Sequence, residues 1–97
     1  MGYIVTWRVF ATKKTLKGLA TMPESVVETF WRLHETLVQH GPTGPRAWRN
    51  YGKLKGRTEK FHCHLTSNHQ WVAVWRAEQD VLTIEILYVG SHQGAPY

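Results

Sequence analysis

The stretch that decides the fold is residues 59–71, EKFHCHLTSNHQW. Its first half alternates apolar and polar residues, and alternate side chains of a strand point to opposite faces of a sheet. One face would receive the apolar side chains of Phe61, Cys63 and Leu65. The other face would receive two imidazoles, those of His62 and His64. The polar residues 66–70 predict a short connection to a second strand, which begins at Trp71.

Other strand and helix patterns lie on both sides of this stretch. The runs rich in aromatic and β-branched residues predict strands at residues 3–10, 60–65, 71–76 and 82–89. Helices are predicted at residues 11–19 and 24–40. The segment TMPE at residues 21–24 has the form of a capping box that opens the second helix, and Gly41-Pro42 would end it. Residues 41–58, rich in Gly and Pro, are predicted to form a loop.

The order β-α-α-β-β-β predicts an α+β fold in a single domain, residues 1–97. In this fold, two N-terminal helices pack on one face of a small antiparallel sheet. The helices would cover the face with Phe61, Cys63 and Leu65. The opposite face, with His62 and His64, is expected to stay open to solvent and to carry any site.

The chain is basic, because 12 Lys and Arg oppose 7 Asp and Glu and give a formal net charge of +5. The positive residues gather in two groups. The first contains Arg46, Arg49, Lys53, Lys55, Arg57 and Lys60, and the second contains Arg8, Lys13, Lys14 and Lys17. Such clusters are typical of proteins that bind nucleic acid, and Trp48 and Tyr51 beside the first group could stack on bases. A solvated basic surface without a ligand is the alternative.

Several function classes are disfavoured by the composition. No run approaches the ~20 apolar residues of a membrane span, and no secretory signal pattern opens the chain, so we expect a cytoplasmic protein with no membrane partner. The single cysteine, Cys63, excludes an internal disulfide. His62 and His64 could begin a zinc site, but Cys63 points away from them and no second His/Cys pair has ligand spacing. We therefore expect no metal and no cofactor.

Several segments, taken in order, resemble the RelE/ParE toxin superfamily. They are ATKKTLKGLATMPE at residues 11–24, KLKG at 53–56, and IEILYVGSH at 84–92. The resemblance spans essentially the whole chain and implies a RelE-like toxin of a type II toxin-antitoxin system, neutralised by a cognate antitoxin. In that superfamily the RelE branch cuts messenger RNA in the ribosomal decoding site, whereas the ParE branch poisons DNA gyrase. The ribosome and messenger RNA are thus the implied partners of a RelE-like member.

The resemblance also implies site residues. RelE-like nucleases carry two basic side chains at alternate positions of the strand after the loop. In this chain, and with the YafQ-like branch as a further guide, the matching positions are His62, His64, His92 and Tyr97. The chain departs from the pattern at Trp71, where many members have an arginine, and at Gln70, where YafQ-like members have an acid. These departures leave the general base open.

The chemistry of metal-free RNA cleavage agrees with such residues. A base must activate the 2′-OH, an acid must protonate the departing 5′ oxygen, and cations must stabilise the phosphorane. Histidine can perform either proton transfer near neutral pH. Our hypothesis is that His64 and His92 share these roles, with His62 as partner or phosphate ligand and Tyr97 as a stacking residue or proton donor. RNA contacts are expected from Arg49, Lys53, Lys55, Arg57 and Arg76.

Three functions stay open. The first is a ribosome-dependent messenger RNA endonuclease toxin, the second a non-catalytic ParE-like inhibitor of DNA gyrase, and the third an inactive RNA-binding domain of the same fold. A protein that only binds its target needs no paired proton donors, so the histidines favour the enzyme. The plainer interpretation makes His62 and His64 polar residues of a solvated strand and Tyr97 a frayed terminus.

Overall fold

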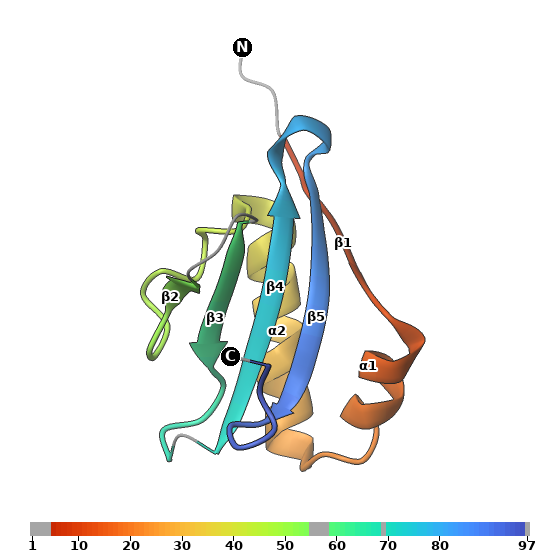
Figure 1. Ribbon diagram of the computed structural model, residues 1–97, viewed down its shortest axis with the longest axis vertical. Coiled ribbons are helices and arrows are strands. Elements are labelled where there is room, and N and C mark those ends of the chain that lie inside the picture. The colour runs from red at the N-terminus through yellow and green to blue at the C-terminus, as the bar shows by residue number, and fades with distance from the viewer. Residues whose placement is uncertain (1–4, 55–58, 69, 97) are drawn as a thin grey trace.

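The computed structural model describes residues 5–54, 59–68 and 70–96 (Figure 1). The strands are β1 (Arg8–Ala11), β2 (Gly52–Leu54), β3 (Lys60–His64), β4 (Trp71–Glu78) and β5 (Thr83–Ser91). The helices are α1 (Lys13–Leu19) and α2 (Glu24–His40), and a 3-10 turn, η1 (Gln79–Val81), precedes β5. Within these described ranges, no helix is long and apolar enough to cross a membrane.

The strands form one sheet in the order β1-β5-β4-β3-β2. All neighbours are antiparallel except β1 and β5, which are parallel. The predicted α+β class and the meander β3-β4-β5 are confirmed. Strand β2 lies inside the segment that the sequence predicts to be a loop. Its three residues form a strand because they pair with β3. No hairpin joins β1 to β5, so the antiparallel direction of the meander does not extend to β1, which pairs with β5 in the parallel direction.

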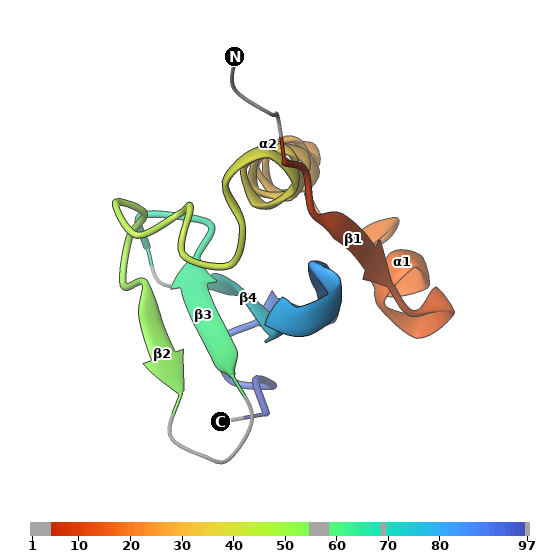
Figure 2. The ribbon, with the colours of Figure 1, turned by 90° about the horizontal axis from the view of Figure 1, so that it is seen from above.

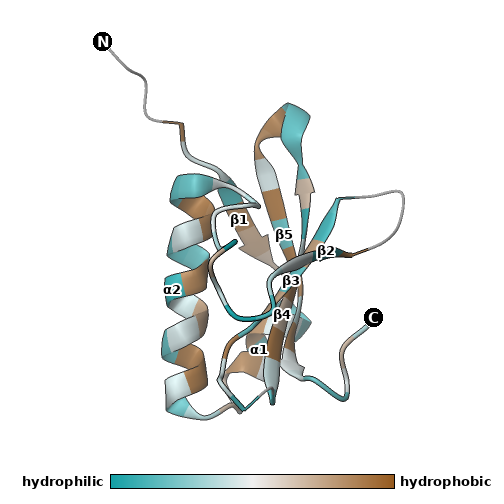
Figure 3. Cartoon of the chain, turned by 90° about the vertical axis from the view of Figure 1, so that its left-hand side faces the viewer, coloured by the Kyte–Doolittle hydropathy of each residue, from teal (hydrophilic) through white to brown (hydrophobic). Residues whose placement is uncertain are grey.

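Helix α2 covers one face of the sheet (Figure 2). It buries residues at intervals of three and four positions, which is the spacing of one helical face: Val26, Phe30, Leu33 and Leu37. Figure 3 shows this apolar stripe alternating with hydrophilic positions along the helix. Leu19 of α1 joins the same core, so both helices pack on the face that the sequence predicts to be covered.

The sheet contributes alternate residues to this core. They are Phe61, Cys63 and Leu65, then Ala73, Trp75 and Ala77 of β4, and Ile84, Ile86 and Val89 of β5, where a register shift opposite Val74 and Trp75 interrupts the alternation. Trp75 is fully buried, and its indole Nε1 donates a hydrogen bond to the carbonyl of Pro42 at 3.2 Å. This bond ties the segment after α2 to the centre of the sheet.

The two ends of α2 differ in how well they were predicted. The capping box is wrong: the N-cap is Pro23, without a side-chain hydrogen bond, and the Thr21 hydroxyl donates instead to the carbonyl of Gly18 at the end of α1. The predicted end at Gly41 is confirmed. Gly41 has φ +81°, and a Cβ there would lie 2.7 Å from the indole nitrogen of Trp7, so the position requires glycine.

Candidate active site

The rings of His64 and His92 meet at one end of the sheet. Their centroids are 5.3 Å apart, with an interplanar angle of 70°. Neighbouring strands bring them together, because His64 pairs with Val72 on β4 and Val72 pairs with Gly90 on β5. The backbone N–H of His92 then donates to the carbonyl of Gln70 at 2.8 Å, which holds the residue beside the start of β4.

His62 lies two residues before His64 on the same face and pairs with Val74. The pKa of His62 is lowered from its ordinary value, first because the ring is partly buried and second because His92 lies near enough for its charge to be felt. Gly52 of β2 pairs with His62, and a Cβ at Gly52 would lie 3.0 Å from Nε2 of that ring. The glycine therefore lets β2 approach the imidazole closely, and the three histidines form one group.

The expectation of a face open to solvent is wrong at this end of the sheet. His64 is only 6% exposed, and its neighbours Val72 and Val74 are also buried. The segment after α2 reaches His64: the carbonyl of Arg49 accepts a hydrogen bond from the backbone N–H of His64 at 2.8 Å, and Asn50 contacts the ring. The chain after β5 turns back beside the ends of β3 and β4, on the side away from α2 (Figures 1 and 2). The strand pattern of residues 60–65 does not reveal that these two segments, one after α2 and one after β5, lie against this face of the sheet.

Asn50 orients the ring of His64. Its amide nitrogen lies 3.2 Å from Nδ1 and 3.5 Å from Nε2. Which ring nitrogen carries a proton depends on the tautomer, and the two distances place the Asn50 carboxamide against the imidazole. A half-turn of the carboxamide would present its oxygen instead and would support a protonated Nδ1. Sequence reasoning missed Asn50, whose positive φ of 50° is a value that asparagine tolerates better than most residues.

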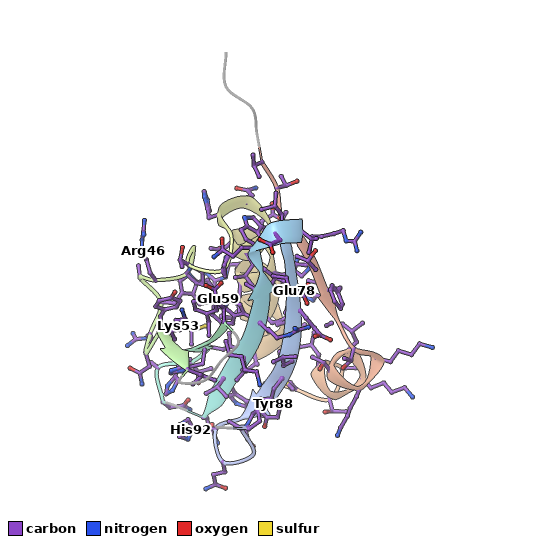
Figure 4. The ribbon with its side chains drawn as sticks, turned by 45° about the horizontal axis from the view of Figure 1, so that its top comes forward. Arg46, Lys53, Glu59, Glu78, Tyr88 and His92 are labelled. Atoms are coloured by element: carbon purple, nitrogen blue, oxygen red, sulfur yellow. The ribbon has the colours of Figure 1, made fainter. Side chains whose placement is uncertain are left out.

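Tyr88 holds the turn that carries His92, and it too was missed. Its hydroxyl donates to the carbonyl of Ser91 at 2.8 Å, and Cβ atoms at Gly90 or Gly94 would each lie 2.7 Å from that hydroxyl oxygen. The phenol ring of Tyr88 therefore packs over Gly90 and Gly94, which leave room for it because they have no side chains. Figure 4 shows Tyr88 and His92 at the same end of the sheet. The spacing Tyr-x-Gly-Ser-His, read as one unit, is the signal that could have found this support.

The predicted RNA-binding residues do not all reach the histidines. Arg49 is exposed and lies next to Asn50, whereas Lys53 is exposed and 3.8 Å from the carboxylate of Glu59. Arg76 forms ion pairs with Glu85 at 3.0 Å and Glu78 at 3.1 Å. It faces Lys60 across the strands, four positions along β4 from the residue that faces His64. Lys55, Arg57 and Tyr97 lie outside the described residues.

Cys63 is separated from the histidines, as the sequence predicts. The thiol is fully buried in the core on the helix-covered face, and burial raises its pKa to about 12. It therefore stays protonated and is not a nucleophile or a metal ligand at neutral pH. In the part of the chain that the structure describes, no group of three His, Cys, Asp or Glu side chains is placed to hold a metal ion.

Two hollows flank the histidine pair. The first, about 490 Å³, lies between α2, the segment after it and the end of β3, and is lined by Thr29, Arg32, Ala47, Trp48, Arg49, His64 and Leu65. The second, about 310 Å³, is lined by Asn68, Gln70, Ser91, His92 and Gln93. One histidine of the pair thus lines each hollow, and an extended ligand that spans both would pass the pair.

No protein-family model matches the sequence, and no curated protein matches it either. Solved structures do match. A chain of the archaeal RelE–RelB complex from Pyrococcus horikoshii OT3 superposes with a TM-score of 0.76 at 20% identity, over 93% of this chain and 99% of that chain. The isolated E. coli RelE toxin gives 0.70 at 11% identity, over 93% and 88%. The YoeB dimer from Staphylococcus aureus gives 0.69 at 12% identity, over 90% and 98%. The chain therefore has the fold of the RelE-like toxins, and the predicted resemblance to the RelE/ParE superfamily is confirmed in its fold.

Proposed function

We propose that the protein is the toxin of a toxin-antitoxin pair and that it cuts messenger RNA on the ribosome without a metal. The observation that carries this proposal is the pair of imidazoles, His64 and His92, with ring centroids 5.3 Å apart between two hollows. Two proton-transfer groups at this separation can reach the two oxygens on opposite sides of one phosphate. The RelE-like fold supports the same assignment.

In the proposed reaction, one imidazole takes the proton of the 2′-OH, and the 2′ oxygen attacks the adjacent phosphorus. The bond from phosphorus to the 5′ oxygen breaks, and the other imidazole gives that oxygen its proton. The products are a 2′,3′-cyclic phosphate and a free 5′-OH, so atoms and charges balance without a water molecule. Asn50 can serve His64 in either protonation state, because its carboxamide offers a donor or an acceptor after a half-turn.

His62 has a supporting role in this proposal. Its lowered pKa keeps the ring neutral near pH 7, where it can donate a hydrogen bond to a phosphate oxygen without repelling a protonated His92. The proton-transfer roles stay with His64 and His92, and Tyr97 remains a proposed stacking residue or proton donor. The cations expected from the sequence, among them Arg49 and Lys53, would bind phosphates of the message or of ribosomal RNA.

The antitoxin would dock on the other side of the molecule. Edge strand β1 and helices α1 and α2 border an apolar groove of about 260 Å³, in which Phe10, Leu16 and Trp31 are 45%, 43% and 49% exposed. Exposed aromatic side chains of this kind are typical anchors of a protein interface. Four cations lie on the same strand and helix as groove residues Phe10 and Leu16: Arg8 on β1, and Lys13, Lys14 and Lys17 on α1. An antitoxin segment with apolar anchors and flanking carboxylates fits this surface.

A translation extract tests the proposed reaction. The purified protein is added to an extract that translates a defined messenger RNA, and cut sites are mapped with and without a drug that stops initiation. We expect cleavage only while ribosomes translate, with 2′,3′-cyclic phosphate ends. Intact message with damaged DNA would favour the gyrase inhibitor, and intact message with intact DNA would favour the inactive RNA-binding domain.

A further inference from the structure

The larger hollow beside His64 has the chemistry of a nucleotide-binding pocket. It lies between the middle of α2 and the segment that follows this helix, which Figure 3 shows running between α2 and the sheet. Two guanidinium groups line it, from Arg32 of α2 and from Arg49. No carboxylate is among the described residues that line it. Such a wall attracts an anion, and a guanidinium can hold a phosphate with two parallel hydrogen bonds.

The pocket walls are held in place. One guanidinium nitrogen of Arg32 donates to the hydroxyl of Thr29 at 3.3 Å, one helical turn earlier. Trp48 is half-buried and packs against the hydrophobic core, and its backbone N–H donates to the carbonyl of Pro45 at 2.8 Å. A half-buried indole beside two cations offers a stacking surface for a base.

The same pocket is continuous with the candidate catalytic pair. His64 is part of its lining, and the backbone N–H of His64 donates to the carbonyl of Arg49, another lining residue. The ring of His64 contacts that of His92, and His92 is part of the lining of the second hollow. An RNA strand that places one phosphate between the two rings would therefore place a neighbouring nucleotide in the pocket.

We propose that this pocket binds one nucleotide of the RNA next to the cleaved linkage. Arg32 and Arg49 hold its phosphate and Trp48 stacks on its base, so the pocket positions the strand rather than transferring protons. The inference rests on the proposed function for the identity of the ligand. It adds Arg32 of helix α2 to the residues that face RNA.

The test measures binding without cleavage. A fluorescent 2′-O-methyl oligoribonucleotide has no free 2′-OH and cannot be cut, so its Kd can be measured on the wild-type protein by anisotropy. We expect Arg32→Gln to raise this Kd about tenfold and to reduce the slope of log K against log salt by about 0.7. The Kd of Arg32→Lys should lie between those of wild type and Arg32→Gln, because lysine keeps the positive charge but lacks the planar guanidinium group.

Val81→Glu is the matched control, since it lowers the net charge by the same one unit at an exposed position in the η1 turn, which lines neither this pocket nor the apolar groove. We expect its Kd to stay within about twofold of wild type at physiological salt, where exposed distant charges are largely screened. Equal losses in Val81→Glu and Arg32→Gln would overturn the pocket, since they would indicate a general effect of net charge. An unchanged Kd in Arg32→Gln, or no saturable binding by wild type, would overturn it as well.

This measurement is independent of the cleavage assay. If the extract shows no cut message while Arg32→Gln alone loses oligonucleotide binding, the pocket stands and the endonuclease proposal fails. If the message is cut and Arg32→Gln binds and cuts like wild type, the endonuclease stands and the pocket fails.

Discussion

Replacing His92 with alanine separates catalysis from folding more cleanly than any other change at the site. The side chain is exposed, and the hydrogen bond from this residue to Gln70 comes from its backbone, which the substitution keeps. Exposed positions of this kind usually change the free energy of unfolding by no more than about 0.5 kcal/mol. His64 is a poorer first choice, because its ring is buried and in contact with Asn50, so removing it changes the packing as well as the chemistry.

The expected loss of activity is much larger than the expected loss of stability. A positioned general acid or base contributes about 10²- to 10⁴-fold to the rate. At 25 °C this range corresponds to about 3–5 kcal/mol of transition-state free energy. His92→Ala should therefore cleave at least about a hundredfold more slowly while unfolding at the same urea concentration as wild type.

Two measurements check this prediction. Cleavage rates come from primer extension on a defined message in a translation extract, and stability comes from urea unfolding followed by tryptophan fluorescence. His40→Ala is the control, because it removes an exposed imidazole at the end of α2. Wild-type cleavage by a folded His92→Ala protein would refute the catalytic role of the pair. Equal losses in His92→Ala and His40→Ala would refute it too.

Three further changes test other parts of the structure. The folded-state pKa of His62 lies below its ordinary 6.5, so the unfolded protein binds a proton at this residue before the folded protein does as the pH falls. The free energy of unfolding, measured by urea titration, should therefore drop between about pH 7 and 5. The drop should be less steep in His62→Gln, and equal slopes would contradict this role of His62. Gly41→Ala should lower the free energy of unfolding by at least about 1 kcal/mol, because Gly41 has a positive φ, whereas Gly18→Ala, at a helical position with open space, should raise it slightly. Equal free energies of unfolding for the two variants in urea titrations would contradict this prediction. Trp31→Glu should weaken antitoxin binding at least tenfold in calorimetry, because it places a charge in the apolar groove, while Val81→Glu, at an exposed apolar residue elsewhere, should not. Equal affinities of the two variants would show that the antitoxin does not bind in the groove.

Much of the fold could be predicted because its signals are local. The alternation through Phe61 and Cys63 selects the covered face of β3, and the helical stripe from Val26 to Leu37 selects the face of α2 that covers it. Both depend only on the periods of strand and helix, which a sequence displays directly. The capping box failed for a related reason, since a pattern of four residues does not say whether Thr21 closes α1 or opens α2.

The site was predicted in part. The pattern on β3 placed His62 and His64 on one face, and the resemblance to RelE-like toxins added His92. Sequence reasoning missed Asn50 and Tyr88, because their roles depend on contacts with residues that the chain brings near only after folding. It also grouped Arg76 with the RNA-binding cations, although Glu85 on the neighbouring strand already pairs with it.

The periods of the elements follow from residues a few positions apart, and the side-chain types and the positive charge follow from composition, so all three could be read from the chain before it folds. Tertiary structure alone decided which of those side chains meet. The sheet register sets His64 across from Val72 and Val72 across from Gly90, and the segment after α2 then covers the first imidazole while the turn after β5 carries the second. Such pairings join residues far apart in the chain, and their geometry follows from the packing of the whole core.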